Sequence, residues 1–565
     1  KEQSISSFMD YMSGLVYDVM KYNYYPFRVL ATEYDIDSSI LFQYMPEWIG
    51  IEGDGEESND VIGSRYEGFV EEMDDLITDF NVDIVQQGSN YIMNITYSDK
   101  YSRVMMERFI ESYRLILSQL ISVESLSDIN YVLESDLELL DSINQTEHAL
   151  DYDDVLDAFN YNLSNGPDGN LVSFNDVVYT YAEGAFIADK IAGSLKDLGV
   201  GVGDNVAFLV ERSELYMFSI LGILSTGAVY VPLDDAHPDD RIQFILNDTE
   251  PKVVLVSDET CERAENLIGS AATLNVSDIL KEDIGTLEEL PVAYGSVACM
   301  LYTSGTTGVP KGVKVTRKSA LNVPTYYNEA YGLTNDDVYG MFATVGFDAG
   351  SWAILSTICA GACLAIIPED IRLDMNAMND YFIEHGVTHT FITTQVGKLF
   401  VDSVEDTSLD VLVVGGEKLG EFASPENYEL IDIYGPTEAF VFVASKNNND
   451  KIDSSSVGDL IYNTKAYILD EEFRRVPVGA VGELYLAGDQ IAEGYLNNEE
   501  ETAHAFIDNP FGEGDYGVLY RTGDMVRVLP DGSLGVVGRR DSQVKIRGNR
   551  VELSEIEAVI REIDY

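Results

Sequence analysis

The sequence predicts an α/β protein of several domains, and three observations lead to this prediction. Its 565 residues correspond to about three to five domains of ordinary size. Hydrophobic residues make up 45% of the chain, which is enough for large buried cores. From Phe174 onward, strand and helix patterns alternate at the spacing of βα units, as in parallel sheets covered by helices. We therefore expect a soluble molecule of layered sheets and helices.

The chain is strongly acidic, with 35 Lys and Arg against 98 Asp and Glu and a formal net charge of −63. This charge argues against nucleic acid or an anionic membrane as a partner. Its spread along the chain indicates a solvated surface, suited to a salty cytoplasm. The chain has no signal-peptide pattern and no apolar run long enough to cross a membrane. Four cysteines without paired spacing predict reduced core thiols, no zinc site and a cytoplasmic setting: Cys261, Cys299, Cys359 and Cys363.

Residues 1–133 are predicted to form an α+β lobe. Apolar residues recur at helical spacing from Ser6 to Met20 and from Arg103 to Ile121. Alternating apolar residues predict strands at 40–44 and 91–97. Nothing in this lobe indicates a catalytic site.

The stretch 134–155 is acidic and polar with short helical pieces, and we predict that it is a linker. Beyond it, helical spacing at 185–198 and 214–226 alternates with apolar runs at 205–210 and 252–256. Strands separated by helices in this way predict a parallel sheet. The large α/β part of the chain begins with this sheet.

The most informative stretch is 298–312, where a loop rich in hydroxyls and glycines follows an apolar run. Hydroxyl and backbone N–H groups bind phosphate oxygens, and glycine lets the main chain approach them closely. The loop is not a Walker A motif, because Lys311 follows Pro310 and precedes Gly312 where that motif has Gly-Lys-Ser/Thr. We predict a phosphate-binding loop made of Thr303, Ser304, Gly305, Thr306, Thr307, Gly308 and Lys311.

This loop resembles that of the adenylate-forming superfamily, which includes acyl-CoA ligases, luciferases and the adenylation domains of nonribosomal peptide synthetases. Further motifs follow in the order found in that superfamily, and their joint order makes coincidence negligible. They lie at residues 346–352, 415–417, 432–438, 482–488, 494–496, 520–524, 538–548 and 551–557. The sequence is similar, more narrowly, to the adenylation domain of a nonribosomal peptide synthetase.

The resemblance implies an adenylate-forming fold at 156–540, with βα-layered subdomains and a small β subdomain. The start of a C-terminal subdomain is expected at 541–565, truncated at Tyr565, so that the family's adenylation lysine is absent. We therefore expect this chain to bind ATP and amino acid but to form adenylate poorly. More weakly, Tyr24–Arg28 and the segments after it resemble the C-terminal lobe of a condensation domain. The sequence has no His-His pair, so no condensation activity is expected from 1–133.

The resemblance also assigns the nucleotide site. Thr303 and Lys311 would act on the triphosphate, Glu438 would hold Mg²⁺, and Thr437 would contact the α-phosphate. The predicted catalytic set is Thr303, Lys311, Glu438 and Lys545, and Thr437 is a predicted nucleotide contact. The other nucleotide contacts are expected from Gly415, Gly416, Glu417, Asp432, Tyr434, Gly435, Asp524 and Arg539.

Three of these assignments have a specific chemical reason. Tyr434 offers a ring to the adenine, and the carboxylate of Asp524 can accept both ribose hydroxyls. Asp432 stands where the family usually has Asn. A carboxylate at that position can accept a hydrogen bond from the adenine amino group but cannot donate one.

Asp348 is expected to pair with the α-ammonium group of an amino acid substrate, because amino-acid-activating members carry Asp here and fatty-acyl or aryl-acid activators generally lack it. A buried carboxylate also needs a cation as partner. The remaining pocket positions are all apolar or glycine: Ala349, Trp352, Phe391, Val413, Gly415, Ile433, Val441 and Phe442. Gly415 would open one wall while Ile433 and Phe442 close others. This favours a medium aliphatic side chain, leucine first, and leaves valine, isoleucine and phenylalanine open.

The resemblance implies a second half-reaction, transfer to the phosphopantetheine thiol of a carrier domain. Asp541 matches the hinge about which the small subdomain swings, and Lys545 lies in a loop expected to face the site at that stage. The implied ligands and partners are ATP, Mg²⁺, an amino acid, a downstream peptidyl carrier domain, the upstream catalytic lobe of a condensation domain and, as an option, a small helper protein. Two alternatives remain: an acyl-CoA or aryl-acid ligase of the same superfamily, and a non-catalytic scaffold.

Overall fold

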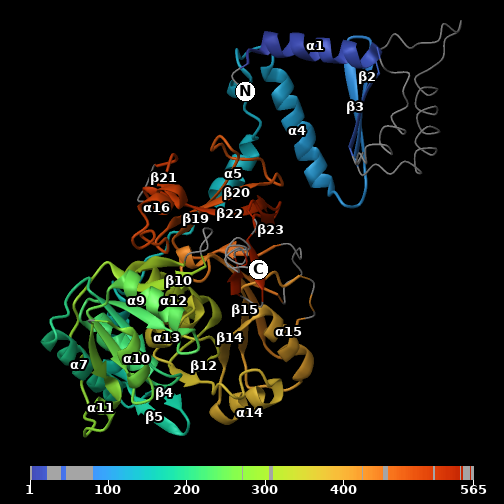
Figure 1. The fold of residues 1–565 in the computed structure, drawn as a ribbon. Helices are drawn as coiled ribbons and strands as arrows, with labels where there is room; N and C mark the ends of the chain where they lie inside the picture. Colours follow the sequence, from blue (N-terminus) through green and yellow to red (C-terminus); the bar gives the residue numbers. More distant parts are fainter. Residues whose placement is uncertain are drawn as a thin grey trace, which may run out of the picture. The chain divides into compact units, whose positions relative to one another are not determined.

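The computed structural model of the chain divides into two compact units, Lys1–Leu137 and Glu138–Tyr565, and each is described by itself (Figure 1). The residues that the structure describes are 3–21, 40–45, 80–269, 271–304, 310–420, 422, 424–448, 456–512, 516–541, 543–546, 549–551 and 560. Among the helices of these segments, none is long and apolar enough to cross a membrane.

The first unit contains a three-stranded sheet and two long helices in its described part. β1 (Ile40–Met45) runs parallel to β2 (Phe80–Gln87), which forms a hairpin with β3 (Asn90–Tyr97). The helices are α1 (Ile5–Lys21) and α4 (Arg103–Gln119), and a short 3₁₀ helix, η2, follows at Leu126–Asp128. The predicted helices and strands of this lobe are therefore confirmed. Its core is made by Phe80, Val82, Ile84 and Met106.

The second unit is built on two large sheets. Across the six-stranded sheet the order is β11 (Lys311–Thr316), β10 (Val297–Thr303), β7 (Val229–Leu233), β6 (Asn205–Leu209), β8 (Val253–Val256) and β9 (Ala272–Asn275). Across the nine-stranded sheet it is β18 (Asp459–Leu460), β17 (Ala444–Asn447), β16 (Glu429–Tyr434), β15 (Val411–Gly415), β14 (His389–Thr393), β12 (Val338–Met341), β13 (Cys363–Ile366), β4 (Asn170–Phe174) and β5 (Val177–Thr180). The central strands of both sheets run parallel, as the βα spacing predicts.

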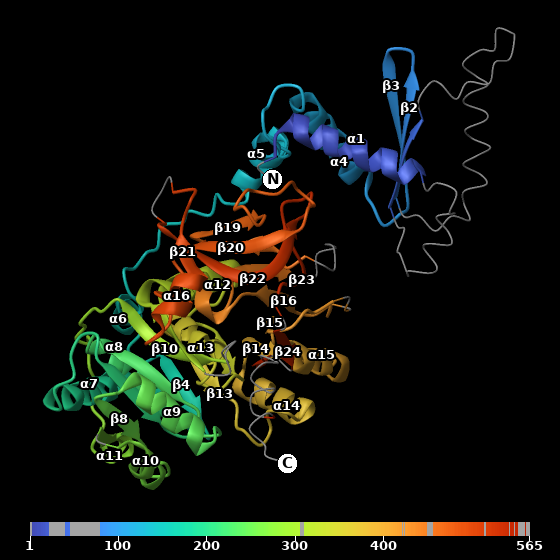
Figure 2. The ribbon, with the colours of Figure 1, turned by 45° about the horizontal axis from the view of Figure 1, so that its top comes forward.

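Helices fill the space between the sheets and cover both outer faces, so the unit is layered (Figure 2). The helices between the sheets are α6 (Val155–Asn165), α7 (Tyr181–Asp197), α8 (Leu215–Ser225), α11 (Val276–Leu280), α12 (Arg317–Tyr331) and α13 (Asp348–Ala360). The outer face of the six-stranded sheet is covered by α9 (Asp239–Thr249) and α10 (Cys261–Leu267). The outer face of the nine-stranded sheet is covered by α14 (Met375–His385) and α15 (Thr394–Ser403).

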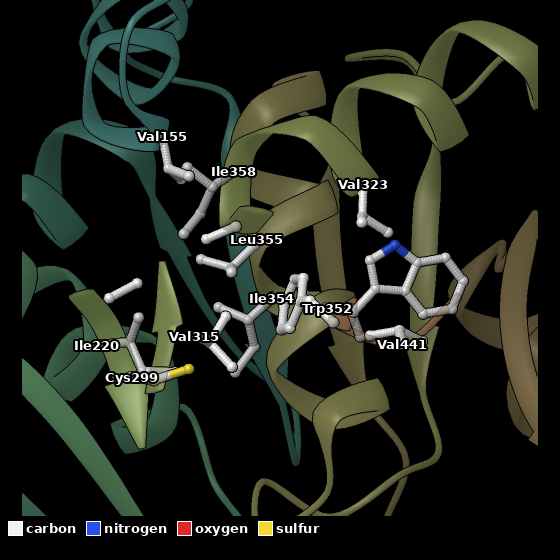
Figure 3. Packing of buried hydrophobic residues seen from close by; sticks show 14 of the residues in the cluster. Val155, Ile220, Cys299, Val315, Val323, Trp352, Ile354, Leu355, Ile358 and Val441 are labelled. Carbon is white, nitrogen blue, oxygen red and sulfur yellow. The ribbon is translucent and has the colours of Figure 1, made fainter. Parts of the chain in front are cut away.

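The helix α13 lies at the centre of this core and is apolar on nearly all sides, which is typical of a fully buried helix. Figure 3 shows its residues Trp352, Ile354, Leu355 and Ile358 among side chains from the six-stranded sheet, such as Cys299 and Val315, and from neighbouring helices. A Cβ atom at Gly350 would lie 2.1 Å from the Thr344 carbonyl oxygen, so only glycine allows the preceding loop to pass so close. This contact fixes where α13, and with it Asp348, begins.

A smaller β subdomain follows. Its strands are β19 (Thr464–Leu469), β20 (Gly482–Gly488), β21 (Phe506–Asp508), β22 (Val518–Val528) and β23 (Leu534–Arg539), with α16 (Glu499–Ala505) before β21. A separate hairpin pairs β24 (Val544–Ile546) with β25 (Asn549–Val551). The prediction of βα-layered subdomains joined to a small β subdomain is thus confirmed.

The stretch predicted as a linker is bonded into the second unit. After α5 (Glu134–Ser142), Asn144 exchanges side-chain hydrogen bonds with the backbone of Ala466 at 3.0 and 2.7 Å. Asn463 bonds the backbone N–H of His148 at 2.8 Å and its carbonyl at 2.9 Å. Residues 144–148 therefore form an ordered strap along the start of β19.

Candidate active site

The candidate site collects the carboxyl ends of several strands. Thr303, Gly415 and Tyr434 are the last residues of β10, β15 and β16, and Asp348 is the first residue of α13. In open α/β sheets ligands bind outside the carboxyl ends of the strands. The topology thus places residues from distant parts of the sequence at these strand ends.

The carboxylate of Asp348 is held in place by hydrogen bonds. Its Oδ2 accepts from the Thr437 hydroxyl at 2.6 Å, and its Oδ1 accepts from the backbone N–H of Ala349 at 2.7 Å. Thr437 opens η3 (Thr437–Ala439), the short 3₁₀ helix that also carries Glu438. The positive end of α13 further favours the ionised carboxylate. The structure therefore joins the predicted ammonium-binding acid to the segment that carries the predicted metal-binding acid.

Glu438 is fully buried, and the hydroxyl of Tyr495 donates a hydrogen bond to its Oε1 at 2.8 Å. The ring of Tyr495 lies 5.1 Å from the ammonium nitrogen of Lys311. Tyr495 lies in the motif at 494–496 but was not among the predicted site residues. An aromatic residue with a polar end, in a motif otherwise made of glycine and leucine, was the signal that could have found it.

Lys311, the last residue of the predicted phosphate loop, is the first residue of β11. Its side chain is buried, with the residue 6% exposed, and its ammonium group forms an ion pair with Glu501 of α16. Two contacts, the Glu501 carboxylate and the Tyr495 ring, therefore hold the charge that we predict to face the triphosphate. A phosphate that reaches Lys311 must share this ammonium with Glu501 or displace it.

The phosphate loop itself is described only at its two ends. Gly305, Thr306, Thr307 and Gly308 lie outside the described residues, whereas Thr303, Ser304 and Lys311 lie within them. The Thr303 hydroxyl oxygen is buried, and in the described part of the chain it has no hydrogen-bond partner. Buried polar groups are nearly always paired, so this hydroxyl fits a site that receives a polar ligand such as a phosphate.

No group of three or more His, Cys, Asp and Glu side chains among the described residues could hold a metal ion by itself. Mg²⁺ is commonly bound by one or two carboxylates together with substrate phosphates and water. A single acid, Glu438, in contact with a hydroxyl donor is compatible with that arrangement. The donor set therefore fits a cation that arrives with the nucleotide.

A continuous series of hydrogen bonds links four polar residues: Tyr434, Asp524, Arg539 and Asp541. The Tyr434 hydroxyl donates to the carboxylate of Asp524, whose other oxygen accepts from Arg539 at 2.7 Å. Arg539 also forms two hydrogen bonds to Asp541, both of 2.7 Å. Burial and the nearby Asp524 charge raise the pKa of Tyr434. The predicted adenine, ribose and hinge positions are thus linked by direct contacts.

Asp432 is only 9% exposed. Burial raises the pKa of its carboxyl from 3.8 to about 7, although the charges of Lys446 and Lys398 oppose the shift. Of the other predicted nucleotide contacts, Glu417 accepts a hydrogen bond from Gln395 at 2.8 Å, and Gly416 has a left-handed φ of 92°.

The apolar and glycine residues of the predicted amino acid pocket are buried and come together. On adjacent parallel strands, Phe391 lies opposite Val413 and Gly415 lies opposite Ile433. The Trp352 ring lies 6.0 Å from the ring of Phe391 and 5.4 Å from that of Phe442. These residues form the predicted pocket wall, and all of them are buried: Ala349, Trp352, Phe391, Val413, Gly415, Ile433, Val441 and Phe442.

The expectation that Gly415 opens one wall was wrong. A Cβ atom at Gly415 would lie 2.6 Å from Cγ1 of Ile433, because the Ile433 side chain already packs over the glycine. The Ile433 side chain fills the space beside Gly415 that a polar or smaller residue at position 433 would leave open. The same wall contains a strained turn, since Phe440 and Val441 have φ values of 44° and 73°, which a β-branched residue such as valine rarely adopts.

Arg212 is a further site-shaping residue that the sequence analysis missed. Its guanidinium group donates to the carbonyl oxygens of Met341, Phe342, Ala343 and Ile367, at the carboxyl ends of β12 and β13. Burial lowers its pKa to about 10. These bonds hold the chain that leads into Asp348. No local pattern signals them, because the partners are backbone atoms more than a hundred residues away.

Lys545 lies in β24, where its backbone is in register with Arg550 of β25. The structure brings together the predicted acids and pocket residues around η3 and α13. Lys545 remains a prediction based on its motif.

Comparison with known proteins agrees with this geometry. Residues 159–496 match the AMP-binding enzyme family. The chain is 40% identical over 402 residues to surfactin synthase subunit 2 of Bacillus subtilis, covering 70% of this chain and 11% of that protein. It is 33% identical over 495 residues to bacitracin synthase 1 of Bacillus licheniformis, covering 86% of this chain and 9% of that protein.

Among solved structures, a four-domain nonribosomal peptide synthetase bound to AMP and glycine superposes with a TM-score of 0.78 at 23% identity. The superposition covers 100% of this chain and 44% of that one. The chain thus spans only a small part of the relatives it matches in sequence. It belongs to the AMP-binding enzyme family.

Proposed function

We propose that this chain activates an amino acid with ATP, forming aminoacyl-AMP and pyrophosphate, for transfer to the phosphopantetheine thiol of a carrier domain. The observation that carries the proposal is the 2.6 Å hydrogen bond between Asp348 and Thr437. It places an acid suited to an α-ammonium group beside Glu438, the residue suited to the metal and the phosphates. An amino acid held at Asp348 would point its carboxylate toward that segment.

In the reaction, a carboxylate oxygen of the amino acid attacks the α-phosphorus of ATP, and the bond to the bridging oxygen of pyrophosphate breaks. Two anions must meet, so the site has to neutralise charge and hold the reactants in line. Lys311 and the hydroxyl of Thr303 are described groups that can bind phosphate oxygens, whereas the Thr437 hydroxyl would have to leave Asp348 to donate to one. Mg²⁺, when bound, would be held by Glu438 and the phosphates and would offset the charge of the triphosphate.

The adenosine is assigned to the chain of Tyr434, Asp524 and Arg539. In this structure the two oxygens of Asp524 accept from Tyr434 and Arg539. A carboxylate has about four acceptor positions, so it can keep these bonds and still accept from ribose hydroxyls. The structure of the four-domain synthetase bound to AMP and glycine supports a nucleotide and an amino acid at this fold.

For the substrate we favour a medium aliphatic amino acid, with leucine first. Apart from Asp348 the wall is apolar, so a polar side chain would lose its hydrogen bonds to water without replacement. The packing of Ile433 over Gly415 narrows the pocket. This makes valine and isoleucine the nearest competitors and disfavours phenylalanine.

We further propose that the first unit is the C-terminal lobe of a condensation domain and that the chain works beside an upstream catalytic lobe and a downstream carrier domain. Two matches support this. The similarity to bacitracin synthase 1 extends over 86% of the chain, and the superposition on the four-domain synthetase covers all of it.

The test is binding and exchange with matched variants. In the full-length protein we expect leucine to stimulate ATP–pyrophosphate exchange, and in this chain we expect leucyl sulfamoyl adenosine to bind in calorimetry, with Asp348→Asn weakening both by at least about 100-fold because the ammonium loses its counter-charge. Asp336→Asn, at an exposed aspartate, is the control and is expected to change neither. Exchange with fatty or aryl acids in place of amino acids would instead support the acyl-CoA or aryl-acid ligase alternative. Absence of nucleotide binding would support the scaffold alternative.

A further inference from the structure

The segment 492–496 lies between the two parts of the candidate site. The backbone N–H of Ala492 donates to the Glu438 carbonyl at 2.9 Å. At its other end, the N–H of Leu496 donates to the Gly312 carbonyl at 2.8 Å. Tyr495 is also bridged to Val313 of β11. The backbone at Tyr495 is therefore fixed both to the strand that follows the phosphate loop and to η3.

The Tyr495 side chain makes two different contacts with site residues. Its hydroxyl donates to Oε1 of Glu438 at 2.8 Å, and its ring face lies 5.1 Å from the Lys311 ammonium. The residue is 5% exposed, and its ring packs edge-on against Phe506 at 5.5 Å. The side chain is thus held from several directions, with its polar end directed at a buried acid.

Each end of this side chain suits a separate task. A hydroxyl bonded to a carboxylate fixes the orientation of that carboxylate, and bonds to charged groups are stronger than neutral ones. An aromatic face near an ammonium group stabilises the cation without neutralising it. The lysine therefore keeps its charge, and the carboxylate of Glu438 is held in one orientation.

We propose that Tyr495 is a positioning residue, which orients Glu438 through its hydroxyl and Lys311 through its ring. The proposal rests on the proposed function, because the roles of Glu438 and Lys311 at the nucleotide give it meaning. It predicts that the two contacts can be separated: the hydroxyl governs metal binding, and the ring governs binding of the metal-free nucleotide.

The experiment compares Tyr495→Phe with the unchanged chain. Mn²⁺, a paramagnetic substitute for Mg²⁺, is titrated by electron paramagnetic resonance in the presence of saturating AMPPNP. AMPPNP alone is titrated by calorimetry in EDTA. We expect Tyr495→Phe to weaken Mn²⁺ binding about tenfold, because one charge-assisted hydrogen bond is lost. Binding of AMPPNP in EDTA is expected to change less than about twofold, because the ring over Lys311 remains.

Two further variants distinguish the role of the Tyr495 ring from the general effect of removing a tyrosine hydroxyl. Tyr495→Leu removes the ring as well and is expected to weaken AMPPNP binding in EDTA. Tyr294→Phe removes a bond of the same kind, from a tyrosine hydroxyl to Asp157 at 2.6 Å, outside the site. This control is expected to change neither titration. If Tyr495→Phe melts at a lower temperature, Tyr495→His, which keeps a ring N–H donor, is expected to restore most of the Mn²⁺ affinity.

The outcomes distinguish this proposal from the function on which it rests. Glu438→Gln is expected to lose Mn²⁺ binding in the AMPPNP complex. If it does and Tyr495→Phe titrates like the unchanged chain, Tyr495 has no positioning role while the proposed function stands. If the unchanged chain binds no AMPPNP, or Glu438→Gln binds Mn²⁺ normally, the proposed function itself fails.

Discussion

Asp432 shows how a single buried acid can affect the stability of the whole chain. It lies on β16, the third strand from one edge of the nine-stranded sheet, opposite Val414 on one neighbouring strand and Lys446 on the other. Its folded pKa of about 7 lies above the ordinary value of 3.8, so the folded chain binds this proton more tightly than the unfolded chain. The stability that results is fully present below the unfolded pKa and is lost as the pH rises through the folded one.

We expect Asp432→Asn to remove this dependence, because asparagine has the same shape and no proton to lose. Relative to the unchanged chain, the variant gains about 3 kcal/mol of free energy of unfolding between pH 5 and pH 8. Urea denaturation at both pH values measures the difference. An equal difference at pH 5 and pH 8 would show that Asp432 is already ionised in the folded chain.

At the scale of elements, α13 depends on one glycine. We expect Gly350→Ala to destabilise the chain by more than about 2 kcal/mol, because its Cβ would lie 2.1 Å from the Thr344 carbonyl oxygen and the loop before Asp348 would have to move. Gly193→Ala is the matched control in α7, since a Cβ there meets nothing within 4 Å. In this exposed helical position we expect alanine to stabilise by about 0.5 to 1 kcal/mol. Urea denaturation of the two variants checks both signs.

The strap at 144–148 leads to a second prediction at this scale. Asn463 has a left-handed φ of 55°, which asparagine tolerates better than most residues, and its side chain bonds both backbone groups of His148. Asn463→Ala is expected to cost about 2 kcal/mol or more of stability through lost hydrogen bonds. It is also expected to speed protease cleavage between residues 144 and 155. Unchanged cleavage would mean that the strap is held by its other contacts alone.

Elements and site residues differ in how far the sequence predicts them. Helices such as α7 and α8 were predictable because helical periodicity is local, and Asp348 and Glu438 were identified because they lie within recognisable motifs. The ion pair of Lys311 with Glu501 was not predictable. It joins residues 190 positions apart, and no short pattern records such a pairing. The packing of Ile433 over Gly415 was missed for the same reason, since it depends on the register of two strands.

For the whole molecule, the dominant property is the net charge of −63. Like charges on a folded surface repel one another, and salt screens this repulsion over a Debye length of about 10 Å at 0.1 M and 3 Å at 1 M. We expect the melting temperature to rise by at least about 5 °C between 0.1 M and 2 M KCl. Sorbitol at matched water activity is the control and is expected to raise it less. Equal melting temperatures at both KCl concentrations would contradict the prediction.

The strap at 144–148 also limits the positions at which this chain can be fused to another protein. The helix α5 includes residues on both sides of the boundary at 137/138, and residues 144–148 are bonded to the segment that starts β19. If the second unit is transplanted into another protein, the transplanted segment must therefore begin before Glu134 to keep both α5 and the strap. A chimera joined at residue 150 would take its strap from a foreign chain. Recombination that joins the second unit to other proteins, in evolution or in the laboratory, is therefore expected to preserve junctions that fall between η2 and α5.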